Sequence, residues 1–153
     1  MAKITLEKAV NAPLSDVWKS WDAFADIYTF HPGIENSYLL DGSQPTGTGA
    51  RRRCDFVGGK NHVLEEIVAY EPEKKLTVKI YDGNIPLKVA FVTFEFRALG
   101  PQRTQITTTA DYEMKMGVLG KLISPIMRKQ LGAGLDALLD GNAAFMTERT
   151  KAA

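Results

Sequence analysis

The C-terminal stretch 119–146 reads LGKLISPIMRKQLGAGLDALLDGNAAFM. Its apolar residues recur at intervals of three and four, the spacing that places side chains on one side of an α-helix. They are Leu119, Leu122, Ile123, Ile126, Met127, Leu131, Leu135, Leu138, Leu139 and Met146. Because Pro125 has no backbone N–H, we predict a short lead-in turn and then a long helix with Ser124 near its N-cap.

A helix with one apolar face must bury that face against another surface, and the rest of the chain supplies strands. Residues 4–10 alternate in the manner of a strand with one inward face. Six further strands are predicted at 34–40, 50–56, 62–70, 76–81, 87–99 and 103–114, separated by turns rich in Gly, Pro, Asn and Asp. Links this short favour antiparallel pairing between strands that are neighbours in the sequence.

Two short helices are predicted between the first and second strands. Their apolar positions are Leu14, Val17, Trp18 and Trp21 in the first helix, and Phe24, Ile27, Tyr28 and His31 in the second. Pro32 ends the second helix, because a proline disfavours helical geometry at the residue before it. We interpret the two tryptophans as core anchors.

Composition limits the classes of function. The chain has 153 residues, with 19 Lys and Arg against 18 Asp and Glu, so its net charge of +1 gives no reason to expect a nucleic acid or an acidic membrane as partner. Cys54 is alone, and His31 and His62 are the two histidines, which makes an internal disulfide impossible and a metal site unexpected. With no signal peptide or membrane span indicated, we expect a cytoplasmic protein.

The order of elements is strand, two short helices, six strands and a long helix. This order predicts an α+β fold in which a curved, seven-stranded antiparallel sheet surrounds the C-terminal helix, as one domain over 1–149 with a disordered tail at 150–153. One helix cannot fill such a sheet, so a cavity is expected. Gly134, which costs about 1 kcal/mol relative to Ala in a helix, has two readings: it clears space for a ligand, or it lets the helix and the sheet approach closely.

Several short motifs resemble one family. They are Asn11-Ala12-Pro13 before Val17-Trp18, Phe30-His31-Pro32-Gly33-Ile34, Gly47-Thr48-Gly49-Ala50-Arg51-Arg52, Glu65-Glu66-Ile67 with Glu71-Pro72 and Lys75-Leu76, and Arg103-Thr104 before the final helix. With these motifs the chain resembles the SRPBCC superfamily of START-like helix-grip proteins, and within it the polyketide cyclase/dehydrase-like branch. The resemblance covers nearly the whole chain and implies a deep apolar cavity. It implies no cofactor and no common catalytic set, so it does not determine the activity.

Three polar residues are candidates for chemistry. His31 is placed by the resemblance near the cavity mouth, where a neutral imidazole could exchange a proton near pH 7, and the alternative is that it caps or packs. Arg52 shares its predicted strand face with Cys54, so it would point inward and need a partner, for which Glu65 on the next strand is suited. The alternative is that Arg51, Arg52 and Arg53 all point outward.

The predicted ligand-binding residues come from the second short helix and its end, from the strands and from the C-terminal helix. They are Tyr28, His31, Arg52, Glu65, Thr108, Tyr112, Met127, Leu131, Gly134 and Leu135. Thr104, Thr108 and Tyr112 would form a mixed polar and apolar wall on the last strand, and Met127 is read either as an adaptable ligand contact or as a core filler.

The sequence lacks the phosphate-binding loop, the dinucleotide fingerprint, the nucleophile elbow and the zinc-protease motif. The leading hypothesis is therefore a protein that binds a small hydrophobic, partly oxygenated ligand. Two alternatives stay open: a polyketide cyclase or dehydratase that uses His31, Arg52 or Glu65, and an accessory protein that engages a protein partner. Whether the protein is an enzyme, and whether it forms a homodimer, the sequence leaves open.

Overall fold

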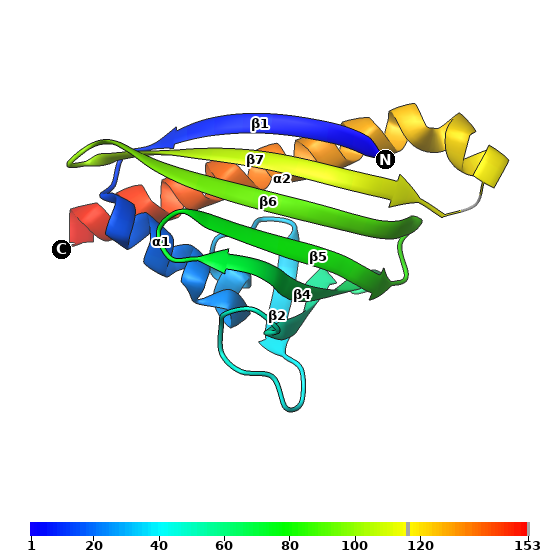
Figure 1. Cartoon of the computed structure of the whole chain (residues 1–153), viewed down its shortest axis with the longest axis horizontal. Helices are drawn as coiled ribbons and strands as arrows, with labels where there is room; N and C mark the ends of the chain where they lie inside the picture. The colour runs from blue at the N-terminus through cyan, green and yellow to red at the C-terminus, as the bar shows by residue number, and fades with distance from the viewer. Residues whose placement is uncertain (116, 153) are drawn as a thin grey trace.

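A seven-stranded antiparallel sheet makes up most of the fold, in the order β1-β7-β6-β5-β4-β3-β2 (Figure 1). The computed structural model describes residues 1–115 and 117–152, and it describes side chains for 1–115 and 125–149. The strands are β1 (Ala2–Val10), β2 (Ile34–Leu39), β3 (Arg51–Phe56), β4 (His62–Glu71), β5 (Lys75–Gly83), β6 (Leu87–Gly100) and β7 (Arg103–Met114). Each strand lies within two residues of its predicted bounds.

Strands β2 to β7 pair with their neighbours in the sequence, as the short links predicted. Strand β1 does not join β2, from which two helices separate it. It pairs instead with β7, with Ile4 opposite Ala110 and Val10 opposite Thr104. This long-range pairing brings the first and the last strand together at one edge of the sheet.

The first short helix, α1 (Leu14–Asp22), buries Val17, Trp18 and Trp21 as predicted. The second, η1 (Phe24–Thr29), is a 3₁₀-helix. It has three residues per turn in place of 3.6, so Phe24, Ile27 and the following Phe30 share the buried face.

The long helix α2 (Gly117–Ala152) lies along one face of the sheet, closest to β1 and β7 (Figure 1). Pro125 lies inside it, so the prediction that the helix begins near Ser124 is wrong: a proline removes one hydrogen bond and bends the axis without having to end the helix. The predicted apolar positions Leu119, Leu122 and Ile123 and the predicted cap Ser124 lie outside the described side chains. α2 continues to Ala152, and the side chains of the tail predicted at 150–153 also lie outside the described set.

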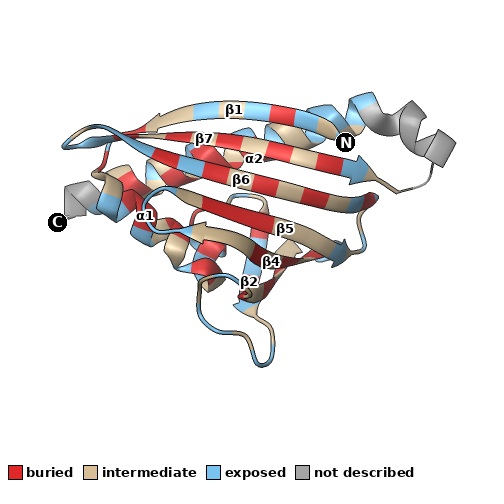
Figure 2. Ribbon diagram, in the orientation of Figure 1, coloured by how far each residue is buried: buried red, intermediate tan, exposed pale blue. Residues whose placement is uncertain are grey.

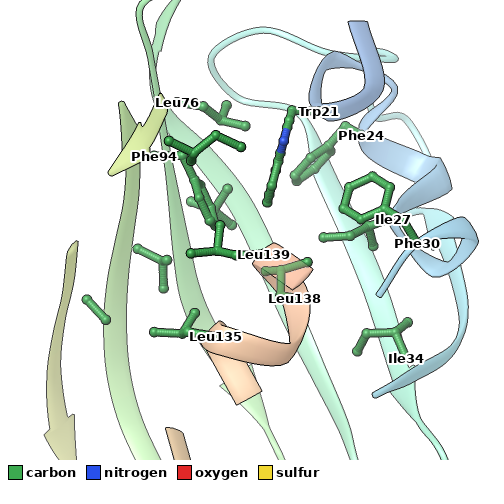
Figure 3. Packing of buried hydrophobic residues seen from close by; sticks show 14 of the residues in the cluster. Trp21, Phe24, Ile27, Phe30, Ile34, Leu76, Phe94, Leu135, Leu138 and Leu139 are labelled. Atoms are coloured by element: carbon green, nitrogen blue, oxygen red, sulfur yellow. The ribbon is translucent and has the colours of Figure 1, made fainter. Parts of the chain in front are cut away.

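The core lies between the helices and the concave face of the sheet. Buried positions alternate with others along β6 and β7, as expected for strands with one inward face (Figure 2). Trp21 packs on Phe94 with ring centroids 4.4 Å apart, and Leu138 and Leu139 of α2 reach the same cluster (Figure 3). Trp18 meets Phe96 edge to face at 5.3 Å, so both tryptophans are core anchors as predicted.

Gly134 and Gly141 on α2 differ in how much space surrounds them. A Cβ atom on Gly134 would meet no atom within 4 Å, so the reading that Gly134 lets the helix and sheet approach closely is wrong. The close approach occurs at Gly141, where a Cβ would overlap the Phe30 carbonyl oxygen and lie 3.0 Å from Pro32 Cδ. Gly141 thus holds the segment before β2 against the helix. None of the helices in the described part of the chain is long and apolar enough to cross a membrane.

Candidate functional site

A hollow of about 480 Å³ lies between α2 and the sheet. Its walls come from η1 and the linker before β2, from strands β2 to β7, and from the middle of α2. Most of the lining side chains are apolar, among them Val63, Val78, Val92, Phe94 and Leu138. The hollow therefore suits a ligand with a large apolar surface.

Eight of the predicted ligand-binding residues line this hollow. They are His31, Arg52, Glu65, Tyr112, Met127, Leu131, Gly134 and Leu135. The open space next to Gly134 is part of the hollow, which agrees with the ligand-clearance reading of that glycine.

Tyr28 and Thr108 do not line it. Tyr28 is 44% exposed, because the tighter turn of the 3₁₀-helix rotates it away from the face that Phe24 and Ile27 share. Thr108 is fully buried, but it stands opposite Phe94 in the sheet, and the larger Phe94 borders the hollow in its place. The α-helical spacing that predicted Tyr28 does not indicate a 3₁₀-helix. The alternation of residues that predicted Thr108 does not indicate which neighbouring side chain covers it.

Arg52 and Glu65 form an ion pair in the wall of the hollow. They stand directly opposite each other on β3 and β4, and Arg52 Nε lies 3.2 Å from Glu65 Oε1. Arg52 is 4% exposed and Glu65 9%, whereas Arg51 and Arg53 on the other face are only partly buried. The alternative in which all three arginines point outward is therefore wrong.

Two further groups hold this pair in place. Arg52 Nη1 donates to the Phe24 carbonyl oxygen at 2.7 Å, and its guanidinium lies 3.9 Å from the centre of the Phe24 ring. The Cys54 thiol donates to Glu65 Oε1 at 2.9 Å. Burial raises the pKa of Cys54, and the Glu65 carboxylate adds to that effect, so the thiol stays protonated and acts as a donor.

Cys54 lies on the predicted strand face of Arg52, but its hydrogen bond to Glu65 was not predicted, and nothing in the sequence indicates the contact of Arg52 with Phe24.

His31 lies in the linker between η1 and β2, and it lines the same hollow. The backbone N–H of Gly33 donates to His31 Nδ1 at 3.0 Å, so in the neutral ring the proton is on Nε2. Burial lowers the pKa of His31 to about 4. The Glu65 carboxylate raises this pKa and the Arg52 guanidinium lowers it, and both effects are smaller than that of burial. At neutral pH His31 is therefore an uncharged hydrogen-bond donor at Nε2.

A second hollow, of about 590 Å³, lies between α1 and the C-terminal part of α2. Exposed polar and charged side chains dominate its rim, including Asp16, Lys19, Asp26 and Arg149. Phe145 and Met146 supply apolar surface to it, but none of the predicted ligand-binding residues lines it. Within the described residues, no three His, Cys, Asp or Glu side chains are grouped so that they could hold a metal ion.

The fold is similar to several solved structures. A structure titled Zhui aromatase/cyclase from Streptomyces sp. R1128 matches with a TM-score of 0.83 at 16% identity, over 97% of this chain and 95% of that one. A protein from Thermus thermophilus matches with a TM-score of 0.81 at 18% identity, over 97% and 99%. A START superfamily protein from Mycobacterium smegmatis matches with a TM-score of 0.75 at 16% identity, over 94% and 98%. At these identities the likeness concerns the fold alone.

The sequence itself matches one family model over residues 1–145, and the model is described as "Polyketide cyclase / dehydrase and lipid transport". No curated protein matches the sequence. The family match and the structural matches agree with the predicted helix-grip fold.

Proposed function

The chain belongs to the polyketide cyclase / dehydrase and lipid transport family, and from that premise we propose that it binds a small hydrophobic, partly oxygenated molecule in the hollow between α2 and the sheet. The observation that carries the proposal is the composition of the wall. Apolar side chains cover most of it, and among the described residues the charged groups on it are those of one compensated pair, Arg52 and Glu65.

The size of the hollow supports the proposal. Its volume of about 480 Å³ falls within the range of small-molecule pockets. Apolar surface transferred from water into such a wall contributes about 25 cal/mol per Å², so hydrophobic contact supplies most of the affinity. The polar pair then orients the oxygens of the ligand.

Native mass spectrometry of the protein purified from its own source tests this proposal directly. We expect a non-covalent adduct of low molecular mass that organic solvent extracts. A fluorescent apolar probe should also bind the emptied protein and be displaced by the extract. Absence of an adduct together with failure to bind any apolar probe would refute the proposal.

A second candidate function is catalysis of a cyclase or dehydratase type, and the polar groups in the wall favour it over a simple carrier with a dry cavity. Cyclisation of a bound poly-keto chain needs a base that takes a proton from carbon, donors that stabilise the negative charge on the attacked carbonyl oxygen, and return of a proton to that oxygen. Glu65 would take the proton and return it to the alkoxide, and His31 Nε2–H or Arg52 would stabilise the oxygen by a hydrogen bond without giving up a proton.

Turnover separates the two candidates. An enzyme should convert a β-keto acyl thioester into a cyclised, ultraviolet-absorbing product, and His31→Asn, which keeps an acceptor for the Gly33 N–H but removes the Nε2 donor, should slow the reaction without abolishing binding. A carrier should return the thioester unchanged. The cytoplasmic location and the homodimer remain predictions.

A further inference from the structure

The Arg52–Glu65 ion pair uses only part of its hydrogen-bonding capacity. Arg52 donates from Nε to Glu65 Oε1 and from Nη1 to the Phe24 carbonyl. Glu65 accepts through Oε1 alone, from Arg52 and from the Cys54 thiol. Among the described residues, no hydrogen bond involves Arg52 Nη2 or Glu65 Oε2. The Nη2 amino group and the Oε2 oxygen of a buried ion pair are therefore unused.

These two atoms are not sealed inside the protein. The fully buried side-chain atoms without a hydrogen-bond partner in the described chain are Trp21 Nε1, Thr108 Oγ1, Tyr112 Oη and Asn142 Oδ1. Arg52 Nη2 and Glu65 Oε2 are not among them, so each keeps some accessible surface. Because both side chains are about nine-tenths buried and both line the hollow, that surface faces the hollow.

The charges decide what can occupy this position. A carboxylate that approached Arg52 would also meet the Glu65 carboxylate, and an ammonium that approached Glu65 would meet the guanidinium, so the attraction to one partner is largely cancelled by repulsion from the other and does not offset the cost of leaving water. A neutral ether or ketone accepts from Nη2 but leaves Oε2 unpaired. A hydroxyl oxygen both accepts and donates.

We propose that Arg52 Nη2 and Glu65 Oε2 together bind a neutral hydroxyl group of the ligand, a phenol, enol or alcohol, which accepts from the guanidinium and donates to the carboxylate. This inference rests on the proposed binding function and narrows it, because it makes the hydroxyl the feature that the site selects. Hydrogen bonds with ionised partners in a site shielded from water are stronger than those between neutral groups.

Binding of four matched bicyclic probes tests the proposal at pH 7: naphthalene, 2-methoxynaphthalene, neutral 2-naphthol and the anion 2-naphthoate. Isothermal titration should show 2-naphthol binding at least about tenfold more tightly than 2-methoxynaphthalene, since the ether leaves a charged acceptor unpaired. The anion should bind most weakly of the three oxygenated probes.

The double variant Arg52→Met, Glu65→Leu replaces the pair by apolar side chains, which removes both charges without leaving either one unpaired. In it the hydroxyl preference should disappear while naphthalene still binds. The control variant Lys3→Gln, Asp111→Asn removes an exposed ion pair on β1 and β7 and should keep the preference.

Two results would overturn the inference. One is equal affinity for 2-naphthol and 2-methoxynaphthalene in the wild type, as expected if Nη2 and Oε2 close on each other when the hollow is empty. The other is a hydroxyl preference that survives in the double variant. If none of the four probes binds, including naphthalene, and the purified protein carries no adduct, the proposed function itself fails, and that outcome is distinct from both.

Discussion

Arg52 keeps its charge in an almost fully buried position. Burial is the largest single effect and lowers its pKa, but the effects of Glu65 and Cys54 together outweigh it, and the pKa of Arg52 is raised overall. A buried charge with a hydrogen-bonded partner is stable, whereas the same charge without its partner is costly. The stabilisation that each residue gives the other can be measured as a coupling free energy between Arg52 and Glu65.

We expect Glu65→Ala to lower the free energy of unfolding by roughly 3 to 5 kcal/mol, because it leaves the Arg52 guanidinium buried with only the Phe24 carbonyl as an acceptor. Urea denaturation of Glu65→Ala, Arg52→Ala and the double variant measures the coupling. The double variant should lose much less than the sum of the single variants. Small additive losses, at most about 1 kcal/mol each as at exposed pairs, would contradict the buried pairing.

His31 makes stability depend on pH. Burial holds its pKa near 4 in the folded protein, against 6.5 as its ordinary value, so between these pH values the unfolded chain binds the extra proton and the folded protein does not. Stability therefore falls as the pH drops from about 6.5 to about 4, by up to about 3 kcal/mol from this residue. His31→Asn, which does not titrate here, should lose correspondingly less over the same interval.

Urea denaturation of the wild type and of His31→Asn at pH 7 and pH 5 measures this difference. Other titrating groups contribute equally in the two proteins, so their effect cancels in the comparison. Parallel losses in wild type and His31→Asn would mean that His31 has an ordinary pKa and is not buried in the wall.

At the scale of elements, α2 carries Gly134 and Gly141 seven residues apart, which places them on the same side of the helix. The first faces the hollow and the second contacts the Phe30 carbonyl, so one helix both borders the hollow and fixes the linker that carries His31. A side chain at Gly141 would separate the helix from that linker.

Gly141→Ala should therefore destabilise the fold by about 1 to 3 kcal/mol through overpacking, and it should shift His31 out of its buried position. NMR titration should show the pKa of His31 rising from about 4 toward its ordinary value.

Gly132→Ala is the matched control, because a Cβ there meets no atom within 4 Å and the helix propensity gained is the same. It should leave the His31 titration unchanged and raise stability by up to about 1 kcal/mol. An unaltered His31 titration in a folded Gly141→Ala variant would show that the contact does not position the linker.

At the scale of the whole molecule, the hollow exists because a seven-stranded sheet that is fastened at one edge by β1 and β7 curves around a single helix. α2 packs closest to β1 and β7, where an ion pair also joins Lys8 to Asp140. Strands β3 to β5 lie farther from the helix, and the space between them is the hollow.

Gly134→Leu should fill part of that space. We expect the affinity for apolar probes to fall at least several-fold, while the free energy of unfolding stays unchanged or rises by up to about 1 kcal/mol, because leucine favours the helix more than glycine does. Probe titration and urea denaturation of the same preparation give both values. Unchanged probe affinity in a stable variant would place the binding site elsewhere.

Local patterns in the sequence were enough to predict the strands from residue 34 onward, the two short helices and the long apolar helix, because alternation and helical spacing are properties of neighbouring residues. The inward direction of Arg52 followed from its place two residues before Cys54 on one strand, and Glu65 was the suitable partner on the next.

The remaining features depend on contacts between elements that are far apart in the sequence. The outward turn of Tyr28 depended on the 3₁₀ geometry of η1, and the close contact of Gly141 with Phe30 joins residues more than a hundred positions apart. The pairing of β1 with β7 and the contact of Arg52 with Phe24 are likewise long-range. Such contacts depend on how completed elements pack together, and spacing within a single element carries no information about them.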